Sequence, residues 1–350
     1  MKILYAIQAT GNGHISRAKE ILPFLKRFGT VDIFLSGSNS HLNPGFEVTY
    51  QSKGLSLFYG KSGNLDYLKM MKDFNPSRIW REANDLPVEK YDLVINDFEC
   101  ISALSCHKKN IPFVHFGHQA SFQSPLTPLP NKYAPIGKWV LKNYVKTPFN
   151  IGLHFDSYDQ FIYSPIIKKD ILHAQPTNRG HVTVYLSHYD DLILEDAFSM
   201  LPDIPFHIFS KKVKSETRKN NIIYFPISTA AFNESLIHCA GIITGAGFET
   251  PAEALYLKKK LLCIPIKGQF EQWCNAEALK NMNVNIIDHI GPLFSLQVAR
   301  WMNHKTERSL VLKHTTDDII EKVIELGMNI SVQELPSDFS YINPIPRFES

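Results

Sequence analysis

Residues 241–253 read GIITGAGFETPAE, an apolar run that ends in a glycine-rich turn, and this pattern is the strongest indication of the fold class. The run 241–244 is typical of a buried parallel strand, and helical spacing of apolar residues starts near residue 250. A turn with Gly245 and Gly247 brings the backbone N–H groups of a helix start close to an anion. The sequence therefore predicts a strand, an anion-binding turn and a helix.

A similar turn lies near the start of the chain, where Gly11-Asn12-Gly13-His14 follows the apolar run 3–9. Ser16 stands where a dinucleotide fingerprint needs its third glycine, and no GxxxxGK[ST] segment occurs, so neither NAD nor P-loop ATP chemistry is indicated and no cofactor is expected. A neutral imidazole at a helix start can act as a general base. His14 is thus a candidate base, with helix capping as the alternative.

Strand-like runs alternate with helical patterns in both halves of the chain. The runs lie at 3–9, 31–35, 91–96 and 112–116, then at 182–186, 205–209, 222–225, 241–244, 261–265 and 284–287. This alternation predicts parallel sheets with helices on both faces. We expect an α/β fold of two Rossmann-like, doubly wound domains facing a cleft, at 1–165 and 178–335, and a tail at 336–350 that returns to the first domain or is loose.

The segment 121–155 breaks this rhythm with four prolines followed by basic and aromatic residues. It predicts a lid, a linker or a docking surface. Around Trp139, lysines recur at helical spacing beside apolar residues, a pattern that suits a membrane face or a lipid-linked acceptor. A surface helix packed on its own domain is the alternative.

Composition limits the function classes. A formal charge of +3 over 350 residues does not favour nucleic acid as a partner. Five cysteines, an odd number without a CxxC pair, indicate reduced core residues and favour the cytosol. No run approaches the roughly 18 apolar residues of a membrane span, which leaves only a peripheral contact with the inner membrane face.

Polar residues follow two neighbouring strand-like runs, and ligands of open α/β sheets bind at the carboxyl ends of strands. Asp97 and Glu99 follow the run 91–96, and either could orient His14, or could be a capping or surface acid. His118 and Gln119 follow the next run and are candidates for contact with an acceptor. No Asp-x-Asp pair occurs, so no metal ligands are expected.

The combination of motifs resembles GT-B glycosyltransferases over residues 2–330. The motifs are Gly-Asn-Gly-His at 11–14, Gly-Phe-Glu-Thr-Pro-Ala-Glu-Ala-Leu at 247–255, Leu-Cys-Ile-Pro at 262–265 and Gln-Phe-Glu-Gln-Trp-Cys-Asn-Ala at 269–276. The likeness is greatest to the branch that contains family 28, with the bacterial lipid II synthase and uncharacterised bacterial and archaeal relatives.

The resemblance implies that the second domain binds a nucleotide sugar, commonly UDP-linked, and that the first binds the acceptor. Glu253 would hold the ribose, and Phe225 and Ile227 would flank the base. The remaining donor residues would be Gly245, Ala246, Gly247, Phe248, Glu249 and Thr250 for the diphosphate, and Gln269, Glu271 and Gln272 for the sugar. Gly11, Asn12 and Gly13, with His118 and Gln119, would lie on the acceptor side.

The implied reaction is an inverting, metal-independent transfer of a hexosyl or N-acetylhexosaminyl group to a hydroxyl of a glycan or glycolipid, as in the synthesis of cell-envelope polysaccharide. Two alternatives stay open: a UDP-sugar epimerase using acids such as Asp97, Glu99 and Glu249, and a non-catalytic sugar-nucleotide-binding subunit. Glu249 would lie close to the diphosphate, where its charge is unfavourable unless the side chain turns away or contacts sugar hydroxyls.

Overall fold

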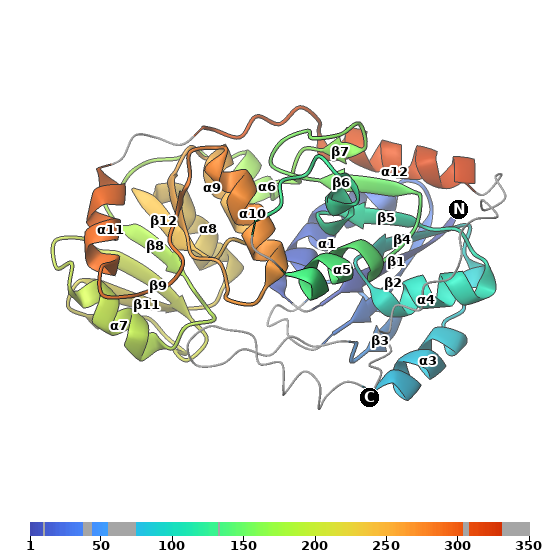
Figure 1. Ribbon diagram of the computed structural model, residues 1–350, viewed down its shortest axis with the longest axis horizontal. Helices are drawn as coiled ribbons and strands as arrows, with labels where there is room; N and C mark the ends of the chain where they lie inside the picture. Colours follow the sequence, from blue (N-terminus) through green and yellow to red (C-terminus); the bar gives the residue numbers. More distant parts are fainter. Residues whose placement is uncertain (10, 38–43, 55–74, 132–133, 304–307, 331–350) are drawn as a thin grey trace.

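The structure, a computed structural model, describes residues 1–9, 11–37, 44–54, 75–131, 134–303 and 308–330. These residues form two lobes side by side, each built on one sheet with helices around it (Figure 1). The α/β architecture of two Rossmann-like domains is therefore confirmed.

The first sheet has the order β3-β2-β1-β4-β5-β6-β7, and its paired strands are parallel. Its strands are β1 (Lys2–Gln8), β2 (Thr30–Ser36), β3 (Tyr50–Ser52), β4 (Leu93–Asp97), β5 (Val114–Gly117), β6 (Asn150–Leu153) and β7 (Ile162–Tyr163). The helices of this part are α1 (Asn12–Leu25), α3 (Pro76–Asp85), η1 (Val88–Lys90), α4 (Cys100–Lys109), η2 (Gln119–Gln123) and α5 (Pro135–Asn143).

Alternation along the central strand β1 explains why both faces of this sheet carry helices. Ile3, Tyr5 and Ile7 join one buried cluster with residues of α1, whereas Leu4 and Ala6 join another with residues of α3 and α4. Successive side chains of a strand point to opposite faces, so a continuous apolar run needs cover on both sides.

The second sheet has the order β10-β11-β9-β8-β12-β13-β14, in which only the β10–β11 pair of the described strands is antiparallel. Its strands are β8 (Val182–Tyr185), β9 (Phe206–Ser210), β10 (Thr217–Lys219), β11 (Ile222–Pro226), β12 (Gly241–Thr244), β13 (Lys260–Cys263) and β14 (Asn285–Ile286). Its helices are α7 (Asp191–Ser199), α8 (Thr229–His238), α9 (Glu249–Tyr256), α10 (Phe270–Lys280) and α11 (Phe294–Met302), and α6 (Lys169–Leu172) lies between the two domains in sequence.

Both sheets reverse their strand order at one place, and the two glycine turns lie there. In the first sheet the order reverses between β1 and β4, and in the second between β8 and β12. The Gly11–Gly13 turn follows β1, and the Gly245–Gly247 turn follows β12. Such switch points are where α/β sheets bind ligands.

The final described helix, α12 (Thr316–Ile330), packs on the first domain although the sequence assigned residues 178–335 to the second. It contacts α1, β4 and β5, and in Figure 1 it lies on the lobe of the first sheet. Ile319, Ile320, Val323 and Ile324 are buried there. The return of the chain is therefore made by α12, which corrects the expected domain range, whereas residues 336–350 lie outside the described part.

The segment 121–155 is more regular than the sequence indicated. It contains β6, a member of the first sheet, and α5, which packs on η2 and on α10 of the second domain. A Cβ at Gly137 of α5 would lie 2.4 Å from Phe270 Cβ, so the two helices are in close contact. The region around Trp139 is thus a domain-contact helix, not a free lid.

No helix among the described residues has the length and apolar character needed to cross a membrane. The described side chains also include no group of three or more His, Cys, Asp or Glu residues arranged to hold a metal ion. All five cysteines are buried and unpaired with one another.

Candidate active site

The two glycine turns meet where the N-terminus of α1 faces the N-terminus of α9. Among the described residues, additional Cβ atoms at Gly11 and Gly247 would find no heavy atom within 4 Å. A Cβ at Gly13 would lie 3.2 Å from Glu249 Cγ, and one at Gly245 would lie 3.3 Å from Gln272 Oε1. The described residues therefore leave the backbone at Gly11 and Gly247 uncovered.

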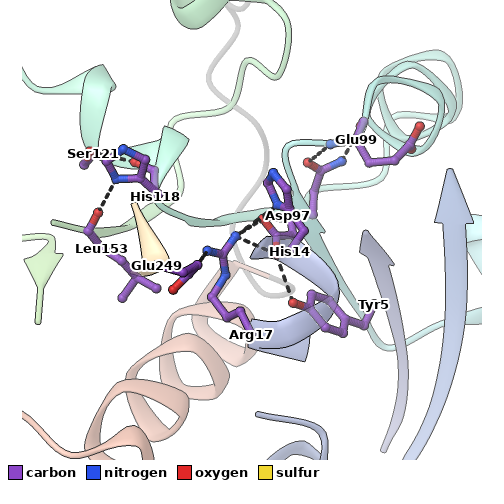
Figure 2. Close-up of polar contacts among 10 residues, drawn as sticks. Tyr5, His14, Arg17, Asp97, Glu99, His118, Ser121, Leu153 and Glu249 are labelled. Carbon is purple, nitrogen blue, oxygen red and sulfur yellow. Dashed lines mark hydrogen bonds and ion pairs between the residues drawn. The ribbon is translucent and has the colours of Figure 1, made fainter. Parts of the chain in front are cut away.

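His14 and Asp97 form a hydrogen-bonded pair at the switch point of the first sheet (Figure 2). Asp97 ends β4 and is fully buried, and its Oδ1 lies 2.9 Å from His14 Nδ1. The Tyr5 hydroxyl donates to Asp97 Oδ2 at 3.1 Å. A carboxylate accepting from Nδ1–H leaves the lone pair of the imidazole on Nε2, the arrangement of a general base with an orienting acid.

Arg17, like Tyr5, belongs to this cluster without having been predicted from the sequence. Its Nη2 donates to Asp97 Oδ1 at 2.7 Å and to Oδ2 at 2.9 Å, and its Nη1 pairs with Glu249 Oε1. Burial alone would raise the pKa of Asp97, but Arg17 and His14 hold that pKa well below its usual range. The signal in the sequence is spacing, because Arg17 lies three residues after His14 on the same face of α1.

Glu99 does not share this environment. It caps α4, where its carboxylate oxygens accept from Ile101 N at 2.9 Å and Ser102 N at 2.6 Å. The side chain is fully buried, and burial raises its pKa. Of the two acids proposed to orient His14, Asp97 lies beside it, whereas Glu99 caps the N-terminus of α4.

Glu253 lies one turn inside α9 and is 2% exposed. Its Oε2 lies 3.1 Å from Nζ of Lys168, which precedes α6 and also donates to Asn233 Oδ1 at 3.1 Å. Burial raises the pKa of Glu253 to about 7 despite the opposing charge of Lys168. The carboxylate expected to hold ribose is therefore paired with a lysine in this structure.

The expected sugar-binding residues begin α10. Gln272 is buried, and its Oε1 accepts from Ala246 N at 3.1 Å and Ile266 N at 3.0 Å, so its amide oxygen holds the glycine turn. Gln269 precedes the helix, and its Oε1 is buried without a hydrogen-bond partner. Glu271 lies in the first turn of α10, as Thr250 does in α9.

His118 and Gln119, expected to touch an acceptor, are 1% and 4% exposed. His118 Nε2 lies 2.7 Å from Asn275 Oδ1, its Nδ1 lies 2.9 Å from Leu153 O, and its ring stacks on Phe248 with centroids 4.0 Å apart. His118 thus joins the two domains, and its contact with an acceptor stays a prediction. Asn12 also crosses the interface, because its Nδ2 donates to the Tyr185 hydroxyl at 3.3 Å.

Comparisons with known proteins agree with this architecture. A family model described as glycosyl transferase family 1 matches residues 1–301. Similar solved structures include spinosyn forosaminyltransferase SpnP, with 14% identity, a TM-score of 0.59 and coverage of 93% of this chain and 99% of that protein. Arabidopsis thaliana UGT89C1 complexed with UDP has 11% identity, a TM-score of 0.59 and the same two coverages.

The MurG protein of Acinetobacter baumannii is also similar, with 13% identity, a TM-score of 0.51 and coverage of 94% of this chain and 97% of that one. A search of curated protein sequences gives no match. At these identities the solved structures establish the shared fold, and together with the family model they confirm the resemblance to GT-B glycosyltransferases.

Proposed function

Because this chain belongs to glycosyl transferase family 1, we propose that it moves a sugar from a nucleotide-linked donor to a hydroxyl of an acceptor. The observation that carries the proposal is the His14–Asp97 pair beside the two glycine turns. We further propose that the transfer inverts the anomeric configuration and needs no metal ion.

The donor side of the proposal rests on the start of α9. The N–H groups there can receive a diphosphate, and the described residues leave the backbone at Gly247 uncovered. UGT89C1 was solved with UDP-L-rhamnose and the similar protein VinC with dTDP. We expect a UDP-linked sugar here, with Glu253 holding the ribose after Lys168 is displaced from it.

The mechanism follows from the placement of His14. Its Nε2 takes the proton of the acceptor hydroxyl as the hydroxyl oxygen forms a bond to the anomeric carbon. The bond from that carbon to the diphosphate breaks on the opposite face, and the N-terminus of α9 stabilises the charge that develops on the leaving diphosphate. A single displacement of this kind inverts the configuration.

We propose a hexosyl or N-acetylhexosaminyl transfer to a glycan or lipid-linked acceptor of the cell envelope, at the cytoplasmic face of the membrane. Its support is α5, where Ile136 is 75% exposed beside the exposed Lys138. An exposed apolar side chain next to lysines suits a lipid-linked acceptor or its membrane.

Calorimetric titration with UDP, GDP and dTDP tests the donor site. We expect selective binding, strongly weakened by Glu253→Ala in protein that melts cooperatively. We then expect His14→Ala to lower transfer by about 10² to 10⁴-fold while nucleotide affinity changes less than about threefold.

Two further measurements test the reaction type. The anomeric configuration of the product, read by NMR, should be opposite to that of the donor, and transfer should persist in EDTA. Binding of no nucleotide by folded protein would remove the proposal, and conversion of the donor sugar without any acceptor would indicate an epimerase instead.

A further inference from the structure

Glu249 raises an electrostatic question for the proposed donor site. It is the first residue of α9, so its carboxylate starts the helix whose N–H groups would receive the diphosphate. An uncompensated carboxylate there would repel the donor. The side chain is only 14% exposed, however, and leans across the interface to Arg17 of the first domain (Figure 2).

Arg17 connects the reactive parts of the two domains. Its guanidinium is 2% exposed, holds both oxygens of Asp97 through Nη2, and pairs with Glu249 through Nη1. A buried arginine must be paired, and its planar fork suits two carboxylates on different sides. Lysine, with a single ammonium, could not hold the same two partners in this geometry.

Two glycines make this arrangement possible. Glu249 passes over Gly13, where a Cβ would lie 3.2 Å from Glu249 Cγ. At Gly117 a Cβ would lie 2.8 Å from Asp97 Oδ1 and 3.1 Å from Arg17 Nη2. The first-domain backbone therefore leaves space for the carboxylate–arginine–carboxylate row.

The row also affects the base. Arg17 Nη2 and His14 Nδ1 lie 3.0 Å apart and both reach Asp97 Oδ1, so Asp97 accepts from both and fixes the ring. One arginine and two carboxylates carry a net charge of −1 when His14 is neutral. Proton transfer to His14 makes the cluster neutral, which favours the step assigned to the base.

We propose that Arg17 is a positioning residue that couples the base to the donor turn. Through Asp97 it fixes the orientation of His14, and through Glu249 it draws a carboxylate away from the diphosphate site. This inference deepens the proposed function and rests on it. It predicts that the two effects of Arg17 can be separated, because only the second depends on the charge of Glu249.

UDP titration and steady-state kinetics on Arg17→Met, Glu249→Gln and the double variant provide the test. We expect Arg17→Met to weaken UDP binding by about tenfold or more and to lower kcat. Adding Glu249→Gln should restore UDP affinity to within about threefold of the wild type and leave kcat low, because Asp97 still lacks its arginine.

The control is Arg27→Met, which removes an exposed pair with Asp317 inside the first domain and should alter neither quantity. A double variant that binds UDP as weakly as Arg17→Met would overturn the charge-offset role. Recovery of kcat together with affinity would overturn the positioning of His14.

Melting curves of the same variants separate this inference from the proposed function. If Arg17 joins the domains in solution, the Tm losses of Arg17→Met and Glu249→Gln are not additive in the double variant. Wild-type protein that binds no nucleotide would contradict the proposed function. Additive Tm losses would contradict the contact of Arg17 between the domains, whether or not the wild type binds nucleotide. Should Arg17→Met not fold, Arg17→Gln, which also removes the charge, takes its place in the same comparison.

Discussion

At the end of β5, Gly117 has a φ of 126°, a conformation that favours glycine, and it lies beside Asp97. Gly117→Ala would add backbone strain and a Cβ 2.8 Å from Asp97 Oδ1. Gly180 has a φ of 87° but open space around it, so Gly180→Ala adds strain alone. We expect backbone strain to lower the stability of both variants by about 1–3 kcal/mol. Because of the added contact with Asp97, Gly117→Ala should lose more stability than Gly180→Ala and should also impair transfer.

Denaturant unfolding of the two variants gives the stability comparison, and an activity assay gives the functional one. Equal losses of stability, with full activity in Gly117→Ala, would show that the space beside Asp97 is not needed.

Glu253 makes stability depend on pH. Its usual pKa of 4.5 rises to about 7 in the folded protein, so between these values the folded state binds more protons than the unfolded state. The stabilising contribution is fully present below pH 4.5 and is lost as the pH rises to about 7. The loss is at most about 3 kcal/mol, and Glu253→Gln should not show it.

Unfolding free energies of the wild type and Glu253→Gln between pH 4.5 and 8 check this, without nucleotide. The wild type should lose stability relative to the variant as the pH rises. Glu325→Gln, which alters an exposed pair with Lys322, serves as the control and should track the wild type. Parallel curves for the wild type and Glu253→Gln would contradict the raised pKa.

Part of this site could be predicted from residue types alone. His14 and Asp97 follow strands that the apolar runs reveal, and neighbouring parallel strands bring their ends together. The spacing from His14 places Arg17 on the same face of α1, but its partners Asp97 and Glu249 lie far away in the sequence. No local pattern encodes such pairings, and the same holds for Lys168. Glu99 was ambiguous, because a cap and an orienting acid look alike in sequence.

At the scale of elements, the apolar spacing of α12 indicates which of its side chains are buried. It does not indicate which domain they pack against. Ile320 of α12 is fully buried against the first domain, whereas Met328 on the same helix is 54% exposed. We expect Ile320→Ala to cost about 2–5 kcal/mol and Met328→Ala less than about 1 kcal/mol.

Thermal or denaturant unfolding measures both losses, and amide hydrogen exchange locates them. Protection should fall in β4 and β5, which α12 contacts, when Ile320 is truncated. Loss of protection confined to the second domain would contradict the packing of α12 on the first.

At the scale of the molecule, the longer apolar runs predicted two sheets and the place of both glycine turns. Strand β7, with two residues, carries too little periodicity to be recognised, whereas the apolar run 284–287 indicated the equally short β14. The relation between the domains was not predictable either, because it depends on contacts such as Phe248 on His118. One buried cluster includes residues of both sheets, so the domains share part of their core.

The position of α12 has a consequence for synthesis on the ribosome. The chain emerges from its N-terminus, and the whole second domain is made before α12. Until then, Leu93 of β4 lacks its cover, because Gly327 of α12 packs against it. The first domain is thus the first to begin folding and the last to be completed, and a nascent chain exposes this apolar face while the second domain is translated.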